Sequence, residues 1–558
     1  MRSRAEMERS GFYQRLALPA LVVITLFFLV PLLITLSSAF IDEGGSLSLA
    51  PIISVFSNPY IHRIMRFTLI QAAISTLASL VVALAGAYLL FAYSFRFKRL
   101  ILALSAVPFV IPSILVVLGF VIFFGNNGFL NTALMNIFSL SEPPIRILYS
   151  YKAIILAHTF YNFPIIMNLV ATYAMHLDRR LEAVSYTLGA SKAKTFFSVT
   201  LPRLLPAIIS ASSLVFLFCF SSFAIILVLG GGPRYTTMEV EIYRQARMMG
   251  NTGAAAALSL FSIAVTSLLL VAYNRSQRRL SKSEAYREPL SLEKRPAGLV
   301  GRVLAVLYTI ISLLFVLAPI ISVIVRSVYS SSTGFTLKWY RQLLNLERAT
   351  SHMGSALTAL TNSLLIALAV SLLAVILGTG LAASIERRKK SRGALELLGM
   401  LSMTVSSVII GLGYFLISSR LRGNASLSYT LVVLAHLVIA LPFVLRVMLP
   451  EYRKIPLSYA HSAWTLGSTP GHAFFSVELP LLKSAMVSAA IFAFAISMGE
   501  FNATLTLSSS TIITLPIVMY RLIGSYNYQG ACALGTILIA VSAVVFIATG
   551  TAKGTHHA

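Results

Sequence analysis

The chain alternates long apolar stretches with short polar segments along its whole length. Several apolar runs, such as 16–40 and 301–325, exceed the roughly 20 residues that a helix needs to cross the hydrocarbon core of a bilayer. Hydrocarbon offers no water to bond free backbone groups, and the runs lack the strict alternation of barrel strands. The pattern therefore predicts an all-α integral membrane protein.

Hydropathy predicts about twelve transmembrane helices, six in each half of the chain. An even number in each half gives both halves the same orientation, so we expect two parallel six-helix repeats. The segment 274–298 is polar, charged and without apolar periodicity, which predicts a linker between halves 1–273 and 299–558. The spans fall near 16–40, 67–93, 100–124, 150–175, 206–229, 253–273, 301–326, 356–385, 394–418, 427–449, 484–507 and 530–549.

The charged residues indicate how these spans are oriented. The chain is 57% hydrophobic, 11% charged and carries a net charge of +26. With the N-terminus inside the cell, 30 of the 44 Lys and Arg residues fall in inner segments, as the retention of positive charge on the cytoplasmic side requires. We therefore expect a cell-membrane protein with both termini and the linker in the cytoplasm, and no nucleic-acid partner. The first apolar run is too long for a signal peptide and is expected to be retained.

One segment of the chain occurs twice. Residues 156–202 and 434–480 align without a gap, 278 positions apart, so that Gly189 corresponds to Gly467 and Pro202 to Pro480. Each copy leaves an apolar span, the fourth or the tenth, enters a polar basic loop and returns through Leu-Pro. Two equivalent loops on one side of a membrane predict a docking surface for a two-fold partner.

Each loop resembles the EAA loop of ATP-binding cassette importer permeases. In that motif a short helix ends at a Gly, here Gly189 and Gly467, and a later Leu-Pro begins the next span, here Leu201-Pro202 and Leu479-Pro480. The resemblance implies coupling loops near 177–205 and 450–483. It also implies ABC ATPase subunits, which we expect in two copies, on the cytoplasmic side, and a solute-binding protein on the outer side.

The chain departs from the family's motif at one position. The motif has a Glu six residues before the Gly, where this chain has Ala183 and His461. Glu182 is one place away, so a small change of register brings a carboxylate into the first loop. The second loop has no such neighbour. We therefore expect the partner to meet an asymmetric pair of loops.

Three further segments resemble the fused permeases for iron(III) or thiamine. They are GGGPRYTTMEVEIYRQA at 230–246, GEFNATL at 499–505 and TLPIVMYRLIGSY at 514–526. No G-x-x-x-x-G-K-[ST] phosphate-binding loop occurs in the chain, so ATP hydrolysis is expected on a separate subunit. The chain is thus predicted to be a permease subunit, with no enzymatic activity and no cofactor, that moves iron(III) or thiamine.

Polar residues inside spans are costly and mark either a transport pathway or a pairing between helices. Glu500 and Asn502 in the eleventh span, and Asn162 in the fourth, are candidates for lining the pathway, while an acid paired across helices remains the other interpretation of Glu500.

His158 and His436 occupy equivalent positions of the repeat. Two histidines alone make no metal site, and iron(III) prefers oxygen ligands, so we expect structural hydrogen bonds and no metal. Cys219 and Cys532 lie in apolar spans and are expected to be small core residues.

A twelve-span secondary transporter not coupled to an ATPase is the alternative to the importer, because it also has two parallel six-span halves. The best-known such family carries a G-x-x-x-D-R-x-G-R-R-like turn between spans two and three. This chain has SFRFKRL there, and its elaborate loops follow spans four and ten instead. The pattern favours the importer. A membrane enzyme has little support, since no H-E-x-x-H or G-x-S-x-G occurs.

Overall fold

The computed structural model of the chain consists almost entirely of helices. It describes residues 4–42, 44–93, 98, 101, 111–177, 180–284, 298–330, 334–344, 356–388, 392–421, 425–507 and 512–554. Within these ranges ten stretches are helical, long and apolar enough to cross a membrane, and two bent helix pairs bring the number to twelve if each pair is one span. The predicted all-α integral membrane fold is confirmed. Two-residue strands, β1 (Tyr329–Ser330) and β2 (Gly334–Phe335), form an antiparallel pair.

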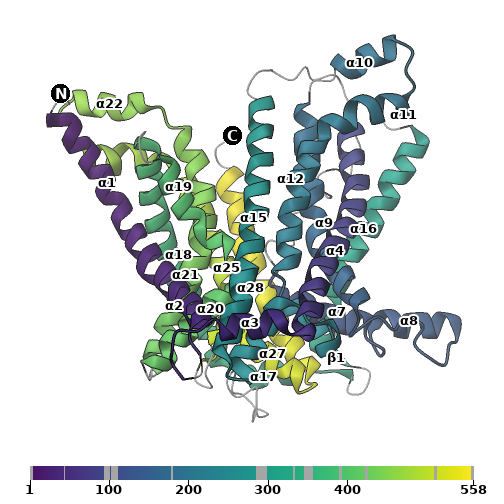
Figure 1. Ribbon diagram of the computed structural model, residues 1–558. Coiled ribbons are helices and arrows are strands. Elements are labelled where there is room, and N and C mark those ends of the chain that lie inside the picture. The colour runs from purple at the N-terminus through teal and green to yellow at the C-terminus, as the bar shows by residue number, and fades with distance from the viewer. Residues whose placement is uncertain are drawn as a thin grey trace. The chain divides into compact units, whose positions relative to one another are not determined.

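The described residues form two compact units, drawn together in Figure 1. Unit 1 contains Met1–Val55, Ile242–Leu260 and Ser327–Ala558, and unit 2 contains Phe56–Glu241 and Phe261–Arg326. The main helices of unit 1 are α1 (Arg4–Ile24), α2 (Val30–Ser37), α17 (Lys338–Leu343), α18 (Ala356–Arg387), α19 (Arg392–Met400), α20 (Ser407–Arg420), α21 (Ala425–Arg453), α22 (Leu457–Thr465), α23 (Pro470–Ala473), α24 (Leu479–Leu481), α25 (Lys483–Gly499), α26 (Asn502–Leu507), α27 (Leu515–Gly524) and α28 (Tyr528–Gly554).

Unit 2 is built in the same way from the other part of the chain. Its main helices are α4 (Pro59–Ala92), α7 (Ser113–Phe124), α8 (Phe129–Phe138), α9 (Tyr151–His176), α10 (Arg180–Thr187), α11 (Lys192–Thr195), α12 (Leu201–Phe220), α13 (Ala224–Leu229) and α16 (Leu299–Val328). Four of the described helices contain residues of both units: α3 (Ala50–Ser57), α14 (Met238–Tyr243), α15 (Thr252–Glu284) and, by its last two residues, α16.

The first helix of each half packs against helices of the other half. In unit 1, α1 lies against α18 and α2 against α20. In unit 2, the hydroxyl of Tyr308 on α16 donates to the carbonyl of Val82 at 3.1 Å, and the ring of Phe315 contacts the rings of Phe160 and Phe163. The compact units therefore differ from the predicted halves 1–273 and 299–558, which stay a prediction about the order of the repeats along the chain.

A glycine at each crossing lets these first helices approach closely. A Cβ at Gly413 of α20 would lie 2.7 Å from the carbonyl oxygen of Pro31, and one at Gly119 of α7 would lie 3.0 Å from that of Pro319. Small residues at helix crossings are the usual means of close packing inside membranes, where no hydrophobic effect drives helices together. The two crossings are equivalent features of the two halves.

Several predicted spans are interrupted. The fifth, near 206–229, ends at Phe220 and resumes as α13 at Ala224. The ninth, near 394–418, bends by 87° between Thr404 and Ser407. The eleventh, near 484–507, breaks at Glu500 and Phe501 between α25 and α26. Hydropathy alone predicted continuous helices here, because apolar residues flank each break on both sides.

Two other boundaries differ from the prediction or lie outside the described residues. The third span, near 100–124, includes residues 102–110, which are not described, and its helix α7 begins at Ser113. The helix α15 continues to Glu284, into the predicted linker 274–298, whose residues 285–297 also lie outside the described part.

Replacing Gly413 by valine is expected to destabilise unit 1. Overpacking of a buried contact costs about 1–3 kcal/mol, and the added Cβ would meet the Pro31 carbonyl. The temperature at which the detergent-purified protein loses its monodisperse gel-filtration peak should therefore fall. Gly393→Ala in α19 is the control, because nothing lies within 4 Å of its Cβ position. Equal temperatures for both variants would contradict the close crossing.

Candidate functional site

The two copies of the repeated loop fold into the same series of elements. In each, a short helix ends at a glycine turn, a one-turn helix follows, and a five-residue π-helical segment leads into the next span. The π-helical segments are Phe196–Thr200 and Phe474–Glu478, which lie at equivalent positions 278 residues apart. Figure 1 shows α10 at the end of unit 2 opposite α8, and α22 at the same end of unit 1 as the N-terminus. The repeat predicted from sequence is thus a repeat of structure.

Gly189 and Gly467 end the short helices α10 and α22 in the left-handed conformation, with φ of +80° and +87°. The N–H of the next residue, Ala190 or Ser468, bonds back to the carbonyl of Ser185 or Ala463 at 3.1 and 3.0 Å. This pattern is the Schellman motif, which satisfies carbonyls that a helix end leaves free. Glycine is favoured because an L side chain strains this conformation.

The residues after each glycine begin a new helix that leads into the next span. Ser191 and Thr469 cap the one-turn helices, accepting hydrogen bonds from Lys194 N at 3.3 Å and His472 N at 3.2 Å. Leu201-Pro202 and Leu479-Pro480 follow directly on the π-helical segments at the start of α12 and α24, where the backbone is already helical.

Both loops expose large apolar side chains at equivalent positions. Leu188 and Leu466 are 81% and 89% exposed, and Phe197 and Phe475 are 65% and 62% exposed. On the first loop, Leu181, Val184 and Leu188 line an open groove together with Pro202 and Arg203. Leu188 and Leu466 lie outside the candidate spans, and exposed apolar side chains at such positions are typical of a surface that another protein covers.

The position of the motif carboxylate differs between the loops. Glu182 of the first loop turns toward its own loop, where Thr200 Oγ1 donates to Glu182 Oε1 at 2.8 Å, and Ala183 beside it is exposed. In the second loop His461 is exposed, and its ring packs against that of Trp464 with centroids 5.0 Å apart. Neither loop therefore holds a carboxylate at the motif position itself.

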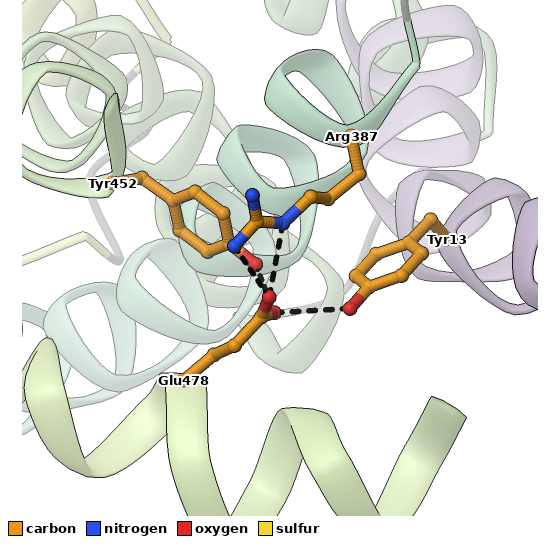
Figure 2. Close-up of polar contacts among 4 residues, drawn as sticks. All are labelled: Tyr13, Arg387, Tyr452 and Glu478. Carbon is orange, nitrogen blue, oxygen red and sulfur yellow. Dashed lines mark hydrogen bonds and ion pairs between the residues drawn. The ribbon is translucent and has the colours of Figure 1, made fainter. Parts of the chain in front are cut away.

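A buried carboxylate, Glu478, lies at the end of the second loop and was not singled out by the sequence analysis. Figure 2 shows it surrounded by Arg387, Tyr452 and Tyr13. Arg387 Nε donates to Glu478 Oε1 at 2.9 Å, and Tyr13 Oη donates to Oε2 at 3.1 Å. The Tyr452 hydroxyl also donates to Oε2. We call these four residues the Glu478 cluster.

The Glu478 cluster joins parts of the chain that are far apart in sequence. Tyr13 lies on α1, Arg387 at the end of α18, and Tyr452 at the end of α21. The side chain of Glu478 is fully buried and that of Arg387 is 6% exposed. A sequence signal existed, since the acid occupies the position of Thr200 within an otherwise similar FFSV-x-LP stretch. No comparable pattern in the sequence indicates that Tyr13, Arg387 and Tyr452 are its partners.

Glu500 and Asn502 flank the break in the eleventh span. Glu500 Oε1 accepts a hydrogen bond from Ala503 N at 2.9 Å, which satisfies a free N–H at the start of α26. Asn502 Nδ2 donates to Ser407 Oγ at 3.1 Å, at the start of α20 beyond the bend of the ninth span. These polar side chains thus meet where two broken spans of unit 1 come together.

The remaining polar candidates lie within packed helices. Asn162 Nδ2 donates to the carbonyl of His158 at 2.9 Å and contacts Cys219 Sγ, and both Asn162 and His158 are buried. His158 Nδ1 bonds to Ser75 Oγ at 3.0 Å. These contacts lie within unit 2, and the lining of a pathway by Asn162 stays a prediction.

The equivalent histidine of the second half is bonded through both ring nitrogens. His436 Nδ1 bonds to Ser497 Oγ at 2.9 Å and Nε2 to Thr504 Oγ1 at 2.8 Å. In the first half, 278 positions earlier, Cys219 and Ile226 replace this serine and threonine. The two histidines therefore make hydrogen bonds between helices, but not the same ones.

Comparison with known proteins gives matches over nearly the whole chain. Residues 75–282 match the family described as "Binding-protein-dependent transport system inner membrane component". The thiamine transport system permease protein ThiP of Escherichia coli is 29% identical over 88% of this chain and 89% of its own length, and that of Haemophilus influenzae is 26% identical over 88% of both. The ferric transport system permease protein FbpB of Actinobacillus pleuropneumoniae is 23% identical over 95% of this chain and 77% of its own length.

Replacing Gly467 by alanine is expected to loosen α22 without unfolding the protein. A left-handed conformation costs an L residue roughly 1–2 kcal/mol, and nothing lies within 4 Å of the Cβ position to clash. Amide hydrogen exchange at the end of α22 should become about tenfold faster, since 1.4 kcal/mol corresponds to a factor of ten. Exchange in α21 should not change. Unaltered exchange in α22 would mean that the turn does not depend on glycine.

Proposed function

Because the chain is a fused permease of a binding-protein-dependent ATP-binding cassette importer, we propose that its loops 177–205 and 450–483 are the surfaces on which the ATPase docks. The chain is a multi-pass inner membrane protein and not an enzyme, its partners are an ABC ATPase and a solute-binding protein, and the secondary-transporter alternative is not favoured. The exposed Leu188 and Leu466, presented in the same way by two Schellman turns, carry the docking proposal.

We further propose that each loop receives one ATPase subunit on the cytoplasmic side of the membrane. Two structurally equivalent loops suit two copies of one partner, and the excess of Lys and Arg in the inner segments supports this orientation. A short helix held by a fixed turn is a rigid knob, which transmits a partner's movement better than a flexible loop. ATP binding would then move both loops, and the helices that follow them, in a single step.

We propose thiamine as the transported solute, with iron(III) as the second candidate. Thiamine permeases match this chain at 26–29% identity over most of both chains, whereas the ferric permease is 23% identical. Both solutes are cations, and Glu500 at the break of the eleventh span is an acidic group suited to such a path. The first half has Ser222 at the corresponding position, so we propose that Glu500 and Asn502 line the path in the second half alone.

Orientation is tested by labelling introduced cysteines from one side of the membrane. The two native cysteines are fully buried, so a cysteine at Leu188 or Leu466 should be the reactive one. Leu188→Cys should react with a membrane-impermeant maleimide in inverted vesicles and not in intact spheroplasts. Ile137→Cys on α8, at the other end of unit 2 and 72% exposed in the parent residue, is the opposite control. Labelling of Leu188→Cys from outside would reverse the proposed orientation.

Docking and transport are tested together in proteoliposomes that contain the permease, its ATPase and its binding protein. Gly189→Trp and Gly467→Trp place a bulky side chain in each turn and should each reduce co-purification of the ATPase at least fivefold. ATP-driven uptake of labelled thiamine by the parent protein should exceed that of iron(III) and fall in both variants.

The possible outcomes separate the docking from the solute. Undiminished ATPase association and uptake in both tryptophan variants would refute the coupling loops. Uptake of iron(III) without thiamine, with docking lost as expected, would leave the coupling loops in place and change the solute. Gly393→Ala, remote from both loops in sequence, controls for effects of substitution as such.

A further inference from the structure

The Glu478 cluster connects the second docking loop directly to three transmembrane helices. Glu478 ends the π-helical segment that follows α23, and it accepts hydrogen bonds from side chains of α1, α18 and α21. Figure 2 shows the arginine and both tyrosines directed at the one carboxylate. The loop and these helices therefore share a single buried polar contact.

The first loop has no carboxylate at the corresponding place. Thr200 stands where the second loop has Glu478, and Ala174 stands where it has Tyr452, both 278 residues earlier. Thr200 donates to Glu182, which belongs to the same loop. The first loop thus uses this position to bond to itself, whereas the second uses it to bond to the spans.

Aromatic packing adds a second link between α1 and the second loop. The rings of Phe12 and Phe474 have centroids 6.0 Å apart, and a Cβ at Gly471 would lie 3.3 Å from the ring of Phe12. Glycine at 471 lets the ring lie close to α23, and the first loop has Ala193 at this place. The N-terminal half of α1, at Phe12 and Tyr13, therefore contacts the second loop directly.

Burial makes the Glu478 cluster resistant to rearrangement. The carboxylate is fully buried and the guanidinium nearly so. Separating a buried ion pair leaves a charge without water or partner, which is strongly unfavourable. The tyrosine hydroxyls bind the second carboxylate oxygen. Any other position of the loop relative to α1, α18 and α21 would break these contacts at a large cost in free energy.

We propose that Glu478 is a positioning residue that makes the second docking loop one rigid body with α1, α18 and α21. This inference rests on the proposed docking of the ATPase. Movement of the second loop is delivered directly to these three helices. At the corresponding position the first loop bonds to itself through Thr200 and Glu182, and it meets α4 through the rings of Phe196 and Tyr88. The two ATPase-facing loops are equal in shape and unequal in stiffness.

The test uses the full-length permease with Glu478→Gln, and with the double variant Glu478→Gln/Arg387→Met. The double variant removes both buried charges, which proteins often tolerate, and so keeps the test valid if the single variant fails to fold. Tyr452→Phe removes one hydroxyl without any change of charge. The control is Glu396→Gln, which breaks the exposed ion pair of Glu396 with Arg453 in the same unit.

The first measurement is amide hydrogen exchange of the permease alone in lipid nanodiscs, which needs no ATPase. Exchange in α22 and α23 should become at least tenfold faster in the double variant and about threefold faster in Tyr452→Phe, with α10 unchanged and Glu396→Gln equal to the parent. Unchanged exchange in α22 would overturn the proposal, even if the loops prove to bind the ATPase.

The second measurement is the number of solute molecules taken up per ATP hydrolysed in the assembled complex. In complexes that the double variant still forms with the ATPase, this ratio should fall at least fivefold. A lower ratio in an assembled complex is not expected from loss of stability alone. An unchanged ratio would overturn the proposal, whereas retained ATPase binding in Gly467→Trp would instead count against the docking function.

Discussion

The absence of water from the hydrocarbon core governs how this chain is built. Every backbone N–H and C=O inside the membrane needs a partner within the protein, so the spans are helices. Where a helix is interrupted, other groups of the protein must bond to the backbone N–H and C=O groups that the break leaves free. Ser406 accepts from Ile409 N after the bend of the ninth span, and Glu500 accepts from Ala503 N at the break of the eleventh. Ser406 and Glu500 are therefore located where helices end, because a helix end leaves backbone N–H groups that need an acceptor.

The two halves keep the same backbone plan while their polar contacts have diverged. Gly189 and Gly467 make the same turn, and Gly119 and Gly413 permit the same crossing. The histidines of the repeat nevertheless bond to different partners, and Glu478 has replaced a threonine. Backbone geometry is constrained by close packing in both halves, whereas a polar side chain needs only to be satisfied, which many different neighbours can do.

Much of this architecture could be predicted from the sequence, because membrane spans and glycine turns are local signals. A run of apolar residues determines the structure of one span, and a Gly at the end of a short helix determines the structure of one turn. The repeat at 278 residues added a long-range signal, since it relates one loop to another without any structure. The spans, the two loops and the Leu-Pro pairs that follow the loops could therefore be predicted from local patterns and from the repeat.

What could not be predicted depends on contacts between distant parts of the chain. Tyr13 and Glu478 are 465 positions apart, and neither hydropathy nor periodicity indicates that their helices meet. The pairing of α1 with α18 was also not predicted, because hydropathy identifies a helix without saying which neighbour covers it.

The packing of the first helix of each half against helices of the other half has a consequence for biosynthesis. Helix α1 packs against α18, which follows much later in the chain, so during synthesis α1 must wait for this partner before it can pack.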